Sequence, residues 1–139
     1  MKMVFRVVLA LFMMGAGVMH FANPDFFVLM VPKMLPEPLW ITWISGVCEL
    51  LLGAAVLWPR TRSSAGLALI ALYVAVFPAN LNMALHPMET GAAAMPPWAL
   101  WLRLPFQAVF IGLAWWVSRP DSQENQTAKA DDVDVSAPL

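Results

Sequence analysis

Glu49 is the residue whose type and position point most directly to chemistry, because it lies near the centre of the apolar segment 39–58. A helix of about 20 residues spans roughly 30 Å, which is the thickness of the hydrocarbon core of a bilayer. A charge at the centre of such a helix costs about 3 kcal/mol on insertion scales, so it usually faces a bundle interior or a functional cavity. A carboxyl group in such a cavity could relay protons.

Glu49 also belongs to a stripe of small and polar residues on the same segment. The stripe consists of Thr42, Ser45, Gly46, Glu49 and Gly53, most of them three, four or seven positions apart, so they share one helix face. Helices that pack closely in lipid use faces of this kind. We therefore expect Glu49 to point into a helix interface.

Polar residues on the other apolar segments complete a candidate for a buried polar pocket. The candidates are His20, Glu49, Asn80, His86, Arg103 and Gln107. Arg103 and Gln107 are four residues apart on one helix face, and the arginine stem can reach the depth of Glu49. We predict a Glu49–Arg103 ion pair; the alternative is that Arg103 extends to the outer membrane surface. Such a pair suits a functional site and a purely structural link between helices equally well.

The sequence contains few residues that could form a metal site, a redox-active thiol pair or a catalytic nucleophile. His20 and His86 could in principle clamp a haem, but they lie near one membrane face rather than at mid-membrane depth. A zinc site lacks a third credible ligand, so no metal site is predicted. Cys48 is the only cysteine, which excludes an internal disulfide and a C-x-x-C redox pair. The sequence contains no phosphate loop, nucleophile elbow or catalytic triad, so whether the protein is an enzyme stays open.

Four apolar segments must position these side chains: 4–22, 39–58, 64–85 and 97–118. The chain is 60% hydrophobic and 12% charged, whereas about a quarter of the residues in soluble domains are charged. Each segment is near spanning length and lacks the alternation of barrel strands. We predict an all-α fold, a four-transmembrane-helix bundle over residues 1–118. The first segment could instead be a signal peptide, but it is long for one and lacks a clear cleavage site.

The segments between the helices predict how the bundle lies in the membrane. The basic residues Lys2, Arg6, Arg60, Arg62 and Arg119 fall at one set of helix ends, which favours a multi-pass protein of the cell (inner) membrane with both termini cytoplasmic. The net charge of −1 provides no basic surface for nucleic acid, so the lipid bilayer is the expected partner.

Three local features refine this layout. The first outer loop predicts a short interfacial helix, with Asn23 as its N-cap and Pro24 at its first position. Pro78 and Pro105 predict kinks in the third and fourth helices. Residues 119–139 are acidic and poor in large apolar side chains, so we predict a disordered acidic cytoplasmic tail.

Four motifs in order resemble those of DoxX-like small membrane proteins. They are GVMHFANPDFF at 17–27, ISGVCELLLG at 44–53 with PRTR at 59–62, VFPANLNMALH at 76–86, and WLRLPFQ at 101–107. The resemblance covers roughly residues 4–116 and implies a four-helix membrane bundle. Some relatives are subunits of thiosulfate:quinone oxidoreductases or of other membrane oxidoreductase systems, and others act as assembly or trafficking factors. The resemblance implies that the polar positions of the family fall on the six candidate residues.

Two functions follow as hypotheses. The first is a quinone- or small-molecule-interacting subunit of a membrane oxidoreductase system, with quinone as the implied cofactor and a redox enzyme as the implied partner. The second is a non-catalytic membrane protein that binds or stabilises a partner protein. The lack of a complete catalytic set favours the second, and the buried acid beside basic and imidazole groups favours the first.

Overall fold

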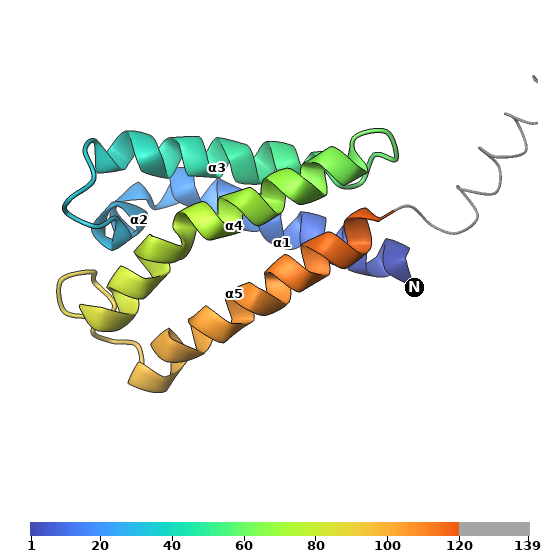
Figure 1. The fold of residues 1–139 in the computed structure, drawn as a ribbon. Coiled ribbons are helices and arrows are strands. Elements are labelled where there is room, and N and C mark those ends of the chain that lie inside the picture. Colours follow the sequence, from blue (N-terminus) through green and yellow to red (C-terminus); the bar gives the residue numbers. More distant parts are fainter. Residues whose placement is uncertain (120–139) are drawn as a thin grey trace, which may run out of the picture.

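The computed structural model describes residues 1–119, and this part of the chain is all helical. Its five helices are α1 (Lys2–Ala22), α2 (Pro24–Met30), α3 (Pro38–Ala55), α4 (Arg62–Leu85) and α5 (Pro97–Ser118) (Figure 1). Four of them are long and apolar enough to cross a membrane, and α2 is the short extra helix. The predicted fold, a four-helix bundle with a short helix in the first loop, is confirmed. The tail predicted to be disordered lies, beyond Arg119, outside the described residues.

Each long helix begins within two residues of its predicted start, and two further features differ from the predictions for reasons of local chemistry. The second long helix ends at Ala55, three residues before the predicted Trp58, because residues 56–61 form the tight turn into α4. Pro24 takes the first position of α2 as predicted, but the Asn23 side chain makes no capping hydrogen bond. The Asn23 backbone N–H instead donates to Met19 O and closes α1. Both Pro78 and Pro105 lie inside continuous helices, and the kinks predicted there stay predictions.

The four long helices form two pairs, in which α1 packs mainly on α3 and α4 mainly on α5. Glycines allow the α1–α3 contact to be close. A Cβ at Gly46 would lie 2.7 Å from His20 Cβ, and one at Gly17 would lie 2.8 Å from Gly46 O. Gly66 on α4 packs against Ser118 on α5 in the same manner. Small residues at such contacts let helix backbones approach in lipid, where dispersion and not the hydrophobic effect drives helix packing.

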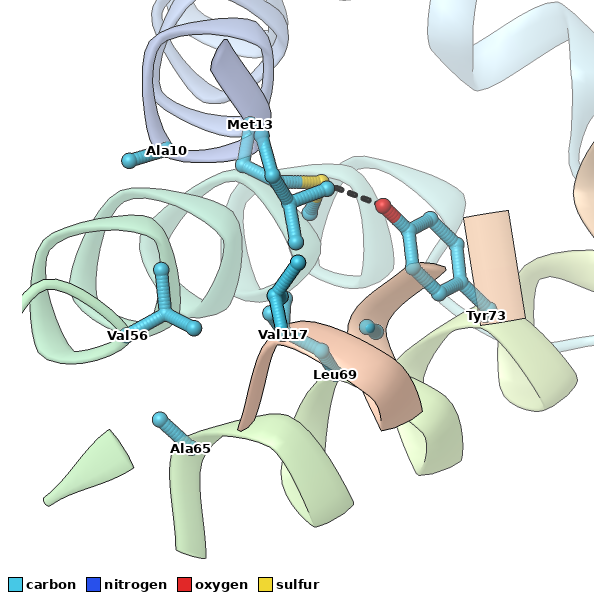
Figure 2. Close-up of a cluster of buried hydrophobic side chains, with 9 residues drawn as sticks. Ala10, Met13, Val56, Ala65, Leu69, Tyr73 and Val117 are labelled. Atoms are coloured by element: carbon cyan, nitrogen blue, oxygen red, sulfur yellow. Dashed lines mark hydrogen bonds between the residues drawn. The ribbon is translucent and has the colours of Figure 1, made fainter. Parts of the chain in front are cut away.

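The two pairs meet at one end of the bundle, which we call the basic end: it holds the N-terminus, the α3–α4 turn and the end of α5 (Figure 1). A cluster of buried side chains from α1, α4, α5 and the α3–α4 turn fills the interior there, and partly buried side chains of α3 pack against it (Figure 2). Arg6 locks α1 to the end of α5, because its Nε donates to Val117 O (2.8 Å) and its Nη2 to Arg119 O (3.2 Å). The side chain is only 2% exposed, so its charge is held by carbonyls that the end of α5 leaves without helix donors.

At the opposite end, which we call the α2 end, α2 contacts α1, α3 and α4. Asn82 Nδ2 donates to Met30 O at 3.0 Å and ties the end of α2 to α4. Lys33 Nζ lies 2.6 Å from Glu89 Oε2 and links the loop after α2 to the loop after α4. The hydrogen bond and charge of Lys33 lower the pKa of the exposed Glu89 carboxyl. Within residues 1–119, the backbones of α2 and α3 do not come close to that of α5, but Met30 of α2 and Leu100 of α5 belong to one buried cluster with Met83 of α4.

Candidate functional site

A cavity of about 460 Å³ lies between the two helix pairs, towards the α2 end. Ligand sites for small molecules typically have volumes of about 300–1,000 Å³. All five helices contribute to its lining, which is mostly aliphatic and aromatic. Five of the six residues predicted from the sequence line it: His20, Glu49, Asn80, Arg103 and Gln107. The long helices therefore bring together side chains that are up to 87 positions apart in the sequence.

His86 is the predicted site residue that lies elsewhere. It is the first residue after α4, and its exposed side chain turns to Asn82, with Nδ1 3.1 Å from Asn82 Oδ1. His20 and His86 thus do not face one cavity, and the haem clamp considered from the sequence does not form. In the described part of the chain, no cluster of three or more His, Cys, Asp or Glu residues is placed to hold a metal ion.

The floor of the cavity is an aromatic layer that separates it from the core at the basic end. Phe110 on α5 stacks on Phe12 of α1 (centroids 4.8 Å apart) and on Tyr73 of α4 (5.9 Å). The Tyr73 hydroxyl donates to Met13 Sδ at 2.9 Å, across the centre of the bundle (Figure 2). In the sequence, the helical spacing puts Tyr73 on one face with Phe77 and Asn80, but nothing in this pattern indicates that Tyr73 closes a cavity.

Glu49 meets His20 rather than Arg103, so the predicted ion pair is wrong. Its Oε2 lies 3.3 Å from His20 Nδ1, and both side chains are about nine-tenths buried. The same Nδ1 lies 2.9 Å from Ala16 O. A carbonyl can only accept, so Nδ1 carries a proton and donates it to Ala16 O. The imidazole ring of His20 also stacks on the ring of Phe27, with 3.8 Å between the centroids, and this contact fixes the orientation of the imidazole.

Arg103 fails to reach Glu49 because of how the helices pair. Its helix, α5, packs on α4, and the Arg103 Nη1 donates to Met83 Sδ on α4 at 3.2 Å. Glu49 is on α3, which packs on α1. The two side chains line opposite walls of one cavity, and each is bound to its own helix pair.

The amide side chains on the α4–α5 wall bind each other. Asn80 Nδ2 donates to Gln107 Oε1 at 3.2 Å, and Gln107 Nε2 donates to Tyr73 O. Because Pro78 has no N–H, Val74 O loses its helix donor, and Tyr73 O is the carbonyl just before it. These bonds hold α5 against α4 and use one amide donor of Asn80 and one of Gln107 within the wall itself.

The α3 wall differs, because its polar atoms lack partners. Thr42 Oγ1, Ser45 Oγ and Glu49 Oε2 are buried and have no hydrogen-bond partner within residues 1–119. All three side chains line the cavity. Thr42 is 2% exposed and Glu49 is 9% exposed. A buried polar group without a partner costs about 1–3 kcal/mol, so three of them on one helix face require an explanation.

The fold and the cavity define a class: an integral membrane protein with four helices able to cross a bilayer and a pocket between two helix pairs. Comparison with known families places it further. The family described as "Domain of unknown function (DUF8561)" matches residues 9–118, so the chain belongs to this family. No curated protein and no solved structure matches the chain.

Proposed function

We propose that this protein binds a small lipid-soluble molecule in the pocket between its two helix pairs. The observation that carries the proposal is the α3 wall, where Thr42, Ser45 and Glu49 present unpartnered polar atoms to a cavity of ligand size. Purely structural polar groups in a membrane bundle normally bond to one another, as Asn80 and Gln107 do on the opposite wall. A bound polar head would supply the missing partners of the α3 wall.

The direction of access supports a ligand that partitions into lipid. α1 and α5 are in contact near the basic end, through Phe12 and Phe110 and through Arg6. Towards the α2 end, α2 packs on α1, α3 and α4, and within the described chain its backbone does not approach that of α5. In this proposal, the entrance to the pocket lies between α1 and α5. A molecule dissolved in the bilayer would enter there without crossing the polar loops.

Quinone is the ligand class that fits best with the resemblance to DoxX-like proteins, which stays a prediction. The aromatic floor and the stacked His20–Phe27 pair suit a planar ring. In this proposal, the protein is a subunit of a membrane oxidoreductase system in the inner membrane, with both termini cytoplasmic. His20 and Glu49 would hold the polar edge of the ring, and Arg103 would lie at the opposite edge.

Quinone binding to the full chain in lipid nanodiscs tests this function. Decylubiquinone is titrated into wild type, Glu49→Gln and His86→Gln, and partitioning into protein-free nanodiscs is subtracted. We expect saturable binding to wild type that Glu49→Gln weakens. His86→Gln is the matched control, because this side chain lies at the same end of the bundle but outside the cavity. Absence of saturable binding to wild type would sink the quinone assignment.

A second function, binding of a partner membrane protein, is favoured by a separate observation. Gly15 on α1 and Gly112 on α5 are exposed, and a Cβ at either would meet nothing within 4 Å. Exposed glycines on lipid-facing surfaces let another helix approach closely. Crosslinking in native membranes followed by purification should recover one defined partner, and Gly15→Leu should abolish its recovery. Recovery of this protein alone would count against the second function.

A further inference from the structure

The three unpartnered atoms of the α3 wall lie along one line on the helix. Thr42, Ser45 and Glu49 are three and four positions apart, so they share a face and extend over about 10 Å of helix at 1.5 Å per residue. Thr42 and Ser45 offer hydroxyl groups, each of which can both donate and accept. The nearest side-chain N–H to Glu49, at His20 Nδ1, is committed to Ala16 O.

The α4–α5 wall offers a polar head fewer free hydrogen-bonding groups than the α3 wall does. Amide donors of Asn80 and Gln107 are engaged with each other and with Tyr73 O. Arg103 is drawn along α4 to the sulfur of Met83. A polar head therefore gains most against α3, where its bonds replace none that already exist.

The chemistry of the α3 atoms selects the kind of head. A carboxyl group accepts when ionised and can donate when protonated, and the two hydroxyl groups do both. A ligand hydroxyl satisfies this set in either protonation state of Glu49. A ketone or an ether oxygen only accepts, so it leaves an ionised Glu49 without a donor. An ammonium group only donates, and it brings a charge that is costly within the bilayer.

The body of the ligand is indicated by the rings around the cavity. His20 and Phe27 stack on one side, and Phe110 stacks on Phe12 across the floor. Phe106 also lines the cavity. Aromatic rings pack well against such surfaces in offset or edge-on arrangements.

We infer that the pocket selects lipid-soluble phenols, with the phenol hydroxyl bound to the α3 wall at Thr42, Ser45 and Glu49 and the ring held among the phenylalanines. This inference rests on the proposed function, because it requires that the pocket binds a small molecule. It goes further by requiring a hydroxyl head, which a quinone lacks and a reduced quinol has.

A matched pair of ligands tests it. 4-Hexylphenol and 4-hexylanisole differ by one methyl group, which removes the O–H donor and keeps the ring, the chain and an acceptor oxygen. Each is titrated calorimetrically into the full chain in lipid nanodiscs, and the heat of partitioning into protein-free nanodiscs is subtracted. We expect the phenol to bind wild type about tenfold more tightly than the ether, as the loss of one well-placed buried hydrogen bond predicts.

The variant arm locates the hydroxyl. In Thr42→Val/Ser45→Ala the preference for the phenol should fall to about threefold or less, since two of three partners are lost. His86→Gln should keep the full preference. The wild-type comparison of the two ligands stands without the variant, so a folding defect in Thr42→Val/Ser45→Ala would not protect the inference.

The outcomes separate the inference from the function beneath it. Equal binding of phenol and ether to wild type overturns the inference and leaves a small-molecule pocket. Binding of decylubiquinone but of neither hexyl compound also overturns the inference alone. Failure of all three to bind above the lipid background overturns the inference and the proposed function together.

Discussion

The same substitution, threonine to valine, should stabilise the ligand-free protein at one buried position and destabilise it at another. Thr42 and Thr90 are 2% and 1% exposed, so valine replaces a buried hydroxyl with a methyl group in both cases. They differ in their bonds. Thr42 Oγ1 has no partner within residues 1–119, whereas Thr90 Oγ1 donates to His86 O at 2.9 Å.

The magnitudes follow from these bonds. A buried hydroxyl without a partner costs about 1–3 kcal/mol relative to one in water. The unfolded reference state here is a separate helix in the membrane, whose hydroxyl is also away from water and can bond only to its own backbone, so the difference between the two states is at the low end of this range. We expect Thr42→Val to raise the free energy of unfolding by about 1 kcal/mol. Thr90→Val removes one hydrogen bond, but His86 O still accepts from the N–H groups of Glu89 and Thr90. The expected loss is also about 1 kcal/mol, so the two variants should differ by about 2 kcal/mol.

Equilibrium unfolding in mixed detergent micelles, followed by circular dichroism on ligand-free protein, measures both values. Ser118→Ala offers a further comparison, because Ser118 Oγ donates to Trp115 O at 3.1 Å and its loss should be mildly destabilising. A Thr42→Val protein no more stable than wild type would refute the reasoning. It would mean that the Thr42 hydroxyl has a partner in the ligand-free protein, and the α3 wall would no longer call for a ligand.

Three further predictions concern the rest of the bundle. Arg6→Met should lower the unfolding free energy by about 2–3 kcal/mol in the same detergent titration, because two bonds from a charged group are lost at the basic end. Gly46→Ala should lower the free energy of unfolding by about 1–3 kcal/mol, because its methyl group would lie 2.7 Å from a side-chain carbon of α1. Gly15→Ala is the matched control: its methyl group would meet nothing within 4 Å, so the free energy of unfolding should stay unchanged or rise by up to about 1 kcal/mol. The pKa of Glu89 is lowered by Lys33, so the stabilisation from this pair is present above the ordinary glutamate pKa and lost as the pH falls through the lowered value. The difference in melting temperature between wild type and Glu89→Gln should thus be present at neutral pH and vanish in acid; a difference independent of pH would contradict the assignment.

The existence of the helices could be predicted from the sequence because membrane length imposes it. The last helix was predicted with both boundaries correct, since Pro97 and Ser118 mark a clear change in composition. The second long helix was predicted too long, because its final apolar residues continue the hydrophobic pattern into a turn. Hydropathy reports whether a residue prefers lipid, and it does not distinguish the last helical turn from an apolar corner.

The partners of the buried charges could not be predicted, because they depend on which helices are neighbours. The number of residues from each helix end predicts how deep a side chain lies in the membrane, and it placed Glu49 and Arg103 at depths that the arginine stem can bridge. This depth is the same for every arrangement of four helices, so it does not show which helices are neighbours. The glycines at 17 and 46 contained part of the answer, since they permit the α1–α3 contact that sets His20 beside Glu49. His86 was misplaced for a different reason: it is one residue beyond the end of α4, where the chain turns away.

The bond between Arg6 and the end of α5 has a consequence for the order of events during synthesis. Arg6 is synthesised long before its two acceptors, which are 111 and 113 positions later in the chain. At about 5–20 residues per second, the arginine waits roughly 6–22 s for them. The glycine contact of α1 with α3 can form within that interval, whereas the ring of helices closes only when the last one is released. A chain that stops before Val117 therefore lacks both of these acceptors for Arg6, and α1 cannot be joined to α5 through them.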